Sequence, residues 1–314
     1  MKAIAIKKYG APDVLQLLDL PSPKIDKDQV LVRVKCAAIN PIDCKMRQGL
    51  FKLLTMKKFP MVLGTDLSGE IVKVGAQVKN WTIGDRVFTS LSPIKVPGAY
   101  CEYVPVATKM LARIPEELSY EVAASLPIAG LTALQALRQK GQIKTGMQVL
   151  INGASGGVGH IAVQLAKYFG AEVTGVCSDR NVDWVKSLGA DRVIDYKKED
   201  FVKDHRQRYD IIFDTIGVRS FGTAKAVMKD NSTFVTTIVN TQRFVRRFLT
   251  SFSGRKLATI LTHINAPEME EMAQLVVEGR VNIKIDRSFA FEEAAEAHRC
   301  SETGRVRGKL LINH

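Results

Sequence analysis

The sequence predicts an α/β protein with two domains, a mostly β domain and a doubly wound parallel-sheet domain. Through the first ~120 residues, short alternating runs are separated by Gly and Pro, which is typical of an antiparallel β domain. From about Ser125, short apolar runs alternate with helical patterns, which indicates a parallel sheet covered on both faces. The 314 residues are enough for about two domains. We expect residues 1–124 and 279–314 to form the first domain and residues 125–278 to form the second.

Each predicted element follows from the period of its apolar residues. In the first domain the expected strands are Lys2–Ile6, Val30–Cys36, Ser68–Val74, Asp85–Phe88 and Tyr100–Val106. In the second domain, strands 148–151, 172–177, 192–195, 210–214 and 233–239 alternate with helices 160–169, 182–188 and 220–228. The amphipathic helix 268–277 ends before Gly279, and strands 281–289 and 309–312 return the chain to the first domain.

A glycine-rich turn, Asn152–Gly159, lies between the apolar run Gln148–Ile151 and the start of the next helix. Gly153, Gly156 and Gly159 recur at every third residue, so the backbone can turn sharply and approach phosphates closely. The N–H groups and positive dipole end of the helix then face the anion. This context favours a dinucleotide pyrophosphate site, and an ordinary strand-to-helix turn is the alternative.

The end of the second parallel strand bears on the choice of nucleotide. Asp179 lies about twenty residues after Gly159, which by spacing alone favours NAD. Asp179 comes after the strand has ended at Cys177, whereas Ser178 and Arg180 can donate hydrogen bonds to a 2′-phosphate. We therefore favour NADPH. The alternative is that Arg180 is a solvated turn residue and Asp179 caps the next helix.

Composition restricts the other partners. The net charge of +13 is compatible with a phosphorylated cofactor, a membrane surface or nucleic acid, but no zinc finger or RNA-binding motif accompanies it. We expect no nucleic-acid partner. No signal peptide or membrane span is expected, and five cysteines without a CxxC pair favour a reducing compartment. A cytoplasmic location is the simplest expectation.

Residues 231–267 contain no acidic residue, and Arg and Lys alternate with aromatic and aliphatic residues through 243–256. We interpret 243–256 as a basic surface helix beside the cofactor. The alternative is a peripheral membrane contact, because anionic lipid attracts clustered basic residues.

Several further motifs accompany the glycine-rich turn. They are Asn40-Pro-Ile-Asp43 with Lys45 and Gly49, Gly64-Thr-Asp66, Gly84-Asp-Arg-Val87, Leu126–Ala133, Gly189–Tyr196, Gly304 and Gly308-Lys309. Together they resemble the zinc-independent quinone oxidoreductase branch of the medium-chain dehydrogenase/reductase superfamily. The resemblance implies a GroES-like catalytic domain, a Rossmann domain that binds NADPH, a small-molecule quinone or enone substrate, and a homodimer.

The resemblance also implies roles for individual residues. Asn40 and Lys45 are the catalytic candidates, with Lys45 as the cation that stabilises an enolate. The cofactor-binding candidates are Ser155, Gly156, Gly157 and Val158 at the pyrophosphate; Ser178, Arg180 and Tyr196 at the 2′-phosphate; Thr132, Ile216, Gly217, Ile238 and Asn240 at the nicotinamide; and Lys309 from the C-terminal segment.

In the zinc alcohol dehydrogenases of this superfamily, cysteine, histidine and glutamate hold a catalytic metal. The matching positions here carry Asn40, Thr65-Asp66 and Ile128, so we expect no metal. Hydride transfer without a Lewis acid suits quinones and α,β-unsaturated carbonyls, in which hydride adds to the β-carbon and a hydrogen bond supports the enolate oxygen.

Each assignment has an alternative. Asn40 before Pro41 can form an ordinary turn, Lys45 can be a solvated charge, Thr132 a buried hydroxyl, and Tyr196 a surface aromatic residue. For the whole protein, a nucleotide-binding regulator or scaffold with little turnover is the competing function, and a nucleic-acid binder is a third.

Overall fold

The computed structural model divides the chain into two compact units. Unit 1 comprises 1–128, 264–277 and 283–314, and unit 2 comprises 129–263 and 278–282. This division keeps 125–128 and 264–277 with the first unit and 279–282 with the second, whereas the sequence boundaries assign these segments the other way round. The structure describes residues 1–50, 52, 59–92, 98–204, 208–238 and 254–314.

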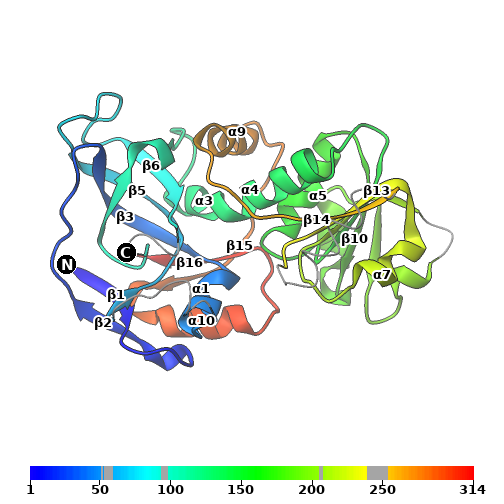
Figure 1. Ribbon diagram of the computed structural model, residues 1–314, viewed down its shortest axis with the longest axis horizontal. Helices are drawn as coiled ribbons and strands as arrows, with labels where there is room; N and C mark the ends of the chain where they lie inside the picture. The colour runs from blue at the N-terminus through cyan, green and yellow to red at the C-terminus, as the bar shows by residue number, and fades with distance from the viewer. Residues whose placement is uncertain (51, 53–58, 93–97, 205–207, 239–253) are drawn as a thin grey trace. The chain divides into compact units, whose positions relative to one another are not determined.

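Two sheets build unit 1 (Figure 1). The larger has the order β15-β16-β3-β5-β6-β8, with β7 also paired to β3, and the smaller has the order β2-β1-β4. All of these pairs are antiparallel except β15 with β16, as expected for a mostly β domain. The strands are β1 Lys2–Ile6, β2 Leu15–Asp19, β3 Gln29–Ile39, β4 Met61–Val62, β5 Asp66–Val74, β6 Arg86–Ser90, β7 Tyr103–Ala107, β8 Ala112–Arg113, β15 Ile285–Ala290 and β16 Lys309–Asn313.

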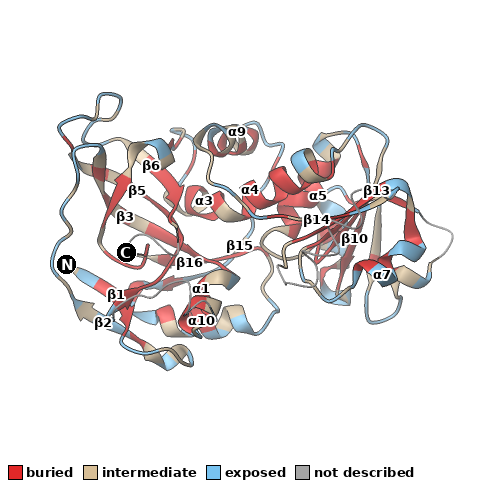
Figure 2. Cartoon of the chain, in the orientation of Figure 1, coloured by how far each residue is buried: buried red, intermediate tan, exposed pale blue. Residues whose placement is uncertain are grey.

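The core of unit 1 lies between its strands and helix α10 (Ala294–Glu302) (Figure 2). Val30, Val32 and Val34 alternate as buried residues along β3, which gives the strand its period of two. The other α-helices described in this unit are α1 Pro41–Arg47, α3 Tyr120–Ser125 and α9 Ala266–Val277. Helix α9 contacts β8, and the amphipathic stripe predicted from its sequence buries Met269, Met272 and Leu275.

A six-stranded parallel sheet forms the centre of unit 2, in the order β11-β10-β9-β12-β13-β14. This confirms the predicted doubly wound sheet. Helices α5 and α6 contact β9, β10 and β11, and α7 contacts β13. The elements are α4 Pro127–Gln135, which crosses the unit boundary, β9 Gln148–Asn152, α5 Gly159–Tyr168, β10 Glu172–Cys177, α6 Val182–Ser187, β11 Arg192–Asp195, β12 Tyr209–Asp214, α7 Phe221–Ala224, β13 Met228–Thr236 and β14 Arg255–Thr259.

Several elements differ from their predicted bounds: β3, β5 and α9 are longer, β7 and β15 begin later, and the largest differences are in α7 and β13. Helix α7 covers only 221–224 of the predicted 220–228, and β13 begins at Met228 rather than Thr233. Met228 pairs with Tyr209, the register then shifts, and pairing resumes between Thr233 and Ile211. Polar residues interrupt the apolar alternation in this irregular stretch, where Asn231 has φ 60°. The start of the strand therefore cannot be recognised from a period of two.

Candidate functional site

The parallel sheet of unit 2 reverses its winding between β9 and β12. Strands β10 and β11 continue the sheet on one side of β9, while β12, β13 and β14 continue it on the other. Ligands of such sheets bind beyond the carboxyl ends of the strands at this reversal. The segments that leave β9, β10 and β12 are therefore the first place to look for a nucleotide site.

In the glycine loop after β9, the backbone at Gly159 packs closely against the backbone at Gly153. Gly153 has φ 85°, and a Cβ atom on Gly159 would lie 2.0 Å from the Gly153 carbonyl oxygen. A Cβ atom on Gly156 would approach only the Gly153 carbonyl, at 3.4 Å, so the loop stays open on that side. His160, the second residue of α5, holds the loop because its Nδ1 lies 2.9 Å from the Gly156 carbonyl. Ser155, Gly156, Gly157 and Val158 are half-buried here.

The turn after β10 lies against this loop. The amide nitrogen Nδ2 of Asn181 donates to Ser155 Oγ at 3.1 Å and to Ser178 Oγ at 3.3 Å. The structure thus brings together two predicted phosphate-binding serines that are far apart in the sequence. Arg180 and Tyr196, the other 2′-phosphate candidates, are exposed at the ends of β10 and β11.

Asp179, whose spacing from the glycine loop favours NAD, forms an ion pair with a neighbouring cation. Lys197 Nζ lies 3.3 Å from Asp179 Oδ1. The backbone N–H of Arg180 and the Lys197 ammonium lower the pKa of the Asp179 carboxyl. The charge of this exposed carboxylate is therefore balanced by Lys197, which comes from the turn after β11.

A buried carboxylate shapes the turn after β12. Asp214 Oδ1 accepts hydrogen bonds from Asn152 Nδ2 at 2.9 Å, from the Ile216 N–H at 3.2 Å and from the Gly217 N–H at 2.9 Å. These bonds tie the ends of β9 and β12 together at the reversal point. They also fix the nicotinamide candidates Ile216 and Gly217, and a Cβ atom on Gly217 would lie 2.1 Å from Ile238. Asn240, the remaining candidate, is outside the described residues.

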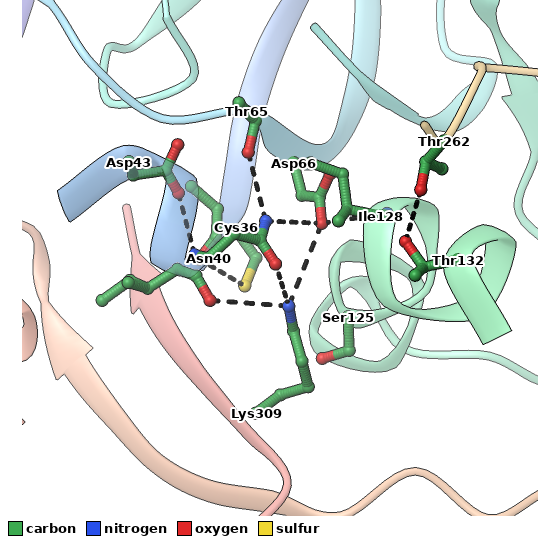
Figure 3. Close-up of polar contacts among 12 residues, drawn as sticks. Cys36, Asn40, Asp43, Thr65, Asp66, Ser125, Ile128, Thr132, Thr262 and Lys309 are labelled. Carbon is green, nitrogen blue, oxygen red and sulfur yellow. Dashed lines mark hydrogen bonds and ion pairs between the residues drawn. The ribbon is translucent and has the colours of Figure 1, made fainter. Parts of the chain in front are cut away.

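Thr132 has a partner that the sequence did not indicate. Its Oγ1 lies 2.6 Å from Thr262 Oγ1, and the side chain is 5% exposed (Figure 3). Gln135, one turn further along α4, donates to the His263 carbonyl at 2.9 Å. The 262–263 segment is thereby held along α4 within unit 2.

Unit 1 contains a buried polar group around Lys309, which we call the Lys309 cluster: Asn40, Thr65, Asp66 and Lys309 (Figure 3). Lys309 Nζ donates to Asn40 Oδ1 at 2.7 Å and lies 3.9 Å from Asp66 Oδ2. Asn40 Nδ2 donates to Asp66 at 2.9 Å and to Thr65 at 3.1 Å. Burial lowers the pKa of Lys309 and raises that of Asp66, while their mutual attraction opposes both shifts.

A hydrogen-bonded chain supports α1 below this cluster. Asp43 Oδ2 accepts the Asn40 N–H at 2.8 Å, and the Tyr100 hydroxyl donates to the same oxygen at 3.4 Å. His298 Nε2 lies 3.2 Å from that hydroxyl, and His298 Nδ1 lies 3.4 Å from Cys44 Sγ. Burial raises the pKa of Asp43 to about 7 and lowers that of His298 to about 3. A neutral imidazole that accepts a hydrogen bond from the Cys44 thiol at Nδ1 and donates from Nε2 to the Tyr100 hydroxyl fits both His298 contacts.

The predicted residues thus fall into three groups. Asn40 and Lys309 meet in unit 1, and Lys45 is half-buried on α1. The phosphate candidates gather after β9, β10 and β11, and Ile216, Gly217 and Ile238 gather after β12 and β13.

Sequence reasoning missed Asn181, Asp214 and Thr262. An acid or amide at the carboxyl end of a strand, as at Asn152 and Asp214, is a usable signal for a site at this sheet edge. Nothing in the sequence pairs Thr132 with Thr262.

The described ranges contain neither a metal-type cluster nor a membrane-spanning helix. No group of three or more His, Cys, Asp or Glu side chains there is arranged to hold a metal ion. Across the same residues, no helix combines the length and hydrophobicity required to span a bilayer. The basic segment 243–256 lies mostly outside the described residues, apart from its last three positions.

The fold and the nucleotide-type loops define a two-domain dehydrogenase or reductase, and comparison with known proteins agrees. Residues 26–116 match the alcohol dehydrogenase GroES-like domain, and residues 188–312 match the zinc-binding dehydrogenase family. The chloroplast envelope quinone oxidoreductase homolog of Arabidopsis thaliana is 33% identical over 99% of this chain and 98% of its own length. The chloroplastic NADPH-dependent alkenal/one oxidoreductase of the same plant is 35% identical over 99% and 79%, respectively.

A solved structure supports the same class of protein. The quinone oxidoreductase from Coxiella burnetii superimposes with a TM-score of 0.94 at 37% identity, covering 100% of this chain and 99% of that one. The chain belongs to the quinone oxidoreductase family of the medium-chain dehydrogenase/reductase superfamily, and it is an oxidoreductase.

Proposed function

We propose that this protein transfers hydride from NADPH to quinones or α,β-unsaturated carbonyl compounds, without zinc. The observation that carries the proposal is the group of donors at the carboxyl edge of the parallel sheet. It contains the open glycine loop, two serine hydroxyls and the exposed Arg180. Relatives named as quinone and alkenal/one oxidoreductases support the class of acceptor.

The residues present fit NADPH. The open side of the loop at Gly156 gives phosphate oxygens access to backbone N–H groups at the start of α5. Ser178, Arg180 and Tyr196, which follow β10 and β11, are the residues that we propose to contact the 2′-phosphate. The Lys197 ammonium beside Asp179 partly offsets the repulsion between that carboxylate and a 2′-phosphate. A relative whose name states NADPH dependence supports the same choice.

The absence of zinc is proposed from the chemistry of the donor groups. Asn40, Thr65 and Ile128 supply no thiolate or imidazole, and Asp66 already faces the Lys309 ammonium. The Lys309 ammonium, 2.7 Å from Asn40 Oδ1, already places a cation in this cluster. A zinc site with nitrogen and sulfur ligands does not suit these residues.

The proposed mechanism is conjugate reduction. NADPH, when bound, would supply a hydride equivalent for the electrophilic β-carbon of the acceptor. Ile216, Gly217 and Ile238 would orient its nicotinamide group, because the Asp214 bonds hold the turn of Ile216 and Gly217 in place. We propose that the Lys45 ammonium faces the developing enolate oxygen, and that Asn40 positions α1 and Lys309. A proton from water or a side chain completes the reduction.

The test is nicotinamide oxidation with NADPH and with NADH, against 1,4-quinones and enones of increasing chain length. We expect turnover with NADPH, little with NADH, and a preference for bulky acceptors. Tight NADPH binding without oxidation by any conjugated acceptor would favour the regulator or scaffold instead.

A homodimer, a cytoplasmic location and the membrane contact of 243–256 stay predictions. Light scattering tests the dimer. Co-sedimentation with anionic vesicles tests the membrane contact, which equal binding by an Arg246→Glu/Arg247→Glu variant would exclude.

A further inference from the structure

Asn181 is a buried residue whose side chain contacts two segments of the proposed nucleotide site. It ends the short turn Asp179–Asn181 after β10 and is 5% exposed. Its backbone N–H donates to the Ser178 carbonyl at 2.9 Å, which fixes its position in the turn. Its side-chain nitrogen then reaches Ser155 Oγ in the glycine loop and Ser178 Oγ at the end of β10.

The direction of these two hydrogen bonds has a chemical consequence. An amide nitrogen only donates, so both serine oxygens are acceptors in their bonds to Asn181. Each hydroxyl has a single proton, and that proton is left to point toward another acceptor. A phosphate oxygen accepts hydrogen bonds and cannot donate them when ionised. Asn181 therefore leaves both serines as donors before an anion arrives.

We propose that Asn181 is a positioning residue that makes Ser155 and Ser178 hydrogen-bond donors to the pyrophosphate and the 2′-phosphate together. The inference rests on the proposed NADPH function and names a residue that determines cofactor specificity. Ser155 belongs to the loop that faces the pyrophosphate of either nicotinamide cofactor. Ser178 lies where only NADPH has a phosphate, so the loss of Asn181 weakens NADPH more than NADH.

Two substitutions separate this role from simple packing. Asn181→Ala removes the shared donor and frees each hydroxyl to rotate. Asn181→Asp keeps the shape, but its carboxylate accepts from both hydroxyls and adds a negative charge near the phosphates. Asn265→Ala is the control, because Asn265 caps the Glu268 N–H at 3.0 Å in unit 1 with the same kind of side-chain amide.

The experiment is calorimetric titration of NADPH and NADH into the full-length wild type and each variant, with thermal unfolding recorded in parallel. We expect Asn181→Ala to weaken NADPH about tenfold, the effect of roughly one charge-assisted hydrogen bond, and NADH less. Asn181→Asp should lower the NADPH-to-NADH affinity ratio further. Asn265→Ala should leave that ratio unchanged.

A Ser155→Ala/Ser178→Ala background completes the test. If Asn181 acts through the two hydroxyls, Asn181→Ala has no additional effect on NADPH affinity in that background. An equal effect with and without the serines would overturn the inference, as would an unchanged ratio in both Asn181 variants. Failure of the wild type to prefer NADPH would instead refute the proposed function, so the two failures are distinguishable.

Discussion

Replacing Lys309 with Met tests whether the Lys309 cluster is held together by a buried ion pair. The substitution removes the charge and keeps an unbranched apolar side chain. Asp66 is fully buried, and its remaining donors, Asn40 Nδ2 at 2.9 Å and the Ile128 N–H at 3.2 Å, carry no charge. Breaking a buried pair by removing one partner destabilises a protein by about 3–5 kcal/mol. The 3.9 Å separation places the expected loss near the lower end, at ~3 kcal/mol.

The loss depends on pH with a definite sign. Burial already raises the pKa of Asp66 above 3.8, and Lys309 is the largest influence that opposes this rise. Without Lys309 the folded-state pKa rises further, so the folded variant binds a proton more tightly than the unfolded chain. The deficit is complete above the folded pKa and shrinks as the pH falls toward the unfolded value.

Urea unfolding at pH 8 and pH 5 measures both effects. Lys198→Met is a matched control, because Lys198 Nζ lies 4.0 Å from Asp195 Oδ2 but its side chain is 80% exposed. We expect the control to lose less than about 1 kcal/mol. Lys309→Met/Asp66→Asn should recover most of the stability, since neither position of the former ion pair then carries a charge. A Lys309→Met loss equal to that of the control, or no recovery in the double variant, would show that a buried ion pair does not hold the Lys309 cluster together.

Three further predictions concern the nucleotide site and the support of α1. Arg180→Ala should weaken NADPH by about tenfold or more and leave NADH unchanged in a calorimetric titration; equal losses for both cofactors would place Arg180 away from the 2′-phosphate. Gly217→Ala should cost about 2 kcal/mol or more in thermal unfolding, because φ is 84° and the new Cβ would lie 2.1 Å from Ile238. Gly279→Ala, at φ 68° in open space, should lose clearly less. Burial lowers the pKa of His298 to about 3, so His298 contributes a loss of stability as the pH falls from 6.5 toward 3, while Asp43, whose pKa is raised to about 7, contributes with the opposite sign. Relative to the wild type, His298→Gln should therefore be more stable at pH 4 than at pH 6, and an equal difference at the two pH values would exclude this role for His298.

The sequence was sufficient where the relevant signal is local. The apolar runs of β9 to β12 and the glycine spacing of 153, 156 and 159 predicted the parallel sheet and its loop. The start of β13 was missed because Lys229, Asp230 and Asn231 interrupt its pattern, and only the pairing of Met228 with Tyr209 reveals it.

The supporting residues of the site depend on contacts between distant positions. Asp214 accepts a hydrogen bond from Asn152, and Asn181 donates one to Ser155. Asp66 forms an ion pair with Lys309, which is distant in the sequence. Asn and Asp side chains cap turns so commonly that their residue types alone do not distinguish these roles. Such partners become visible only when the fold brings the segments together.

The proposed function requires that hydride passes from NADPH to the β-carbon of a conjugated acceptor. The most direct measurement supplies NADPH labelled with deuterium at the transferable position, in ordinary water, and locates the label in a reduced enone by NMR. We predict deuterium at the β-carbon and solvent hydrogen at the α-carbon. Deuterium at the carbonyl carbon, or no transfer from NADPH to any conjugated acceptor, would contradict the proposed function.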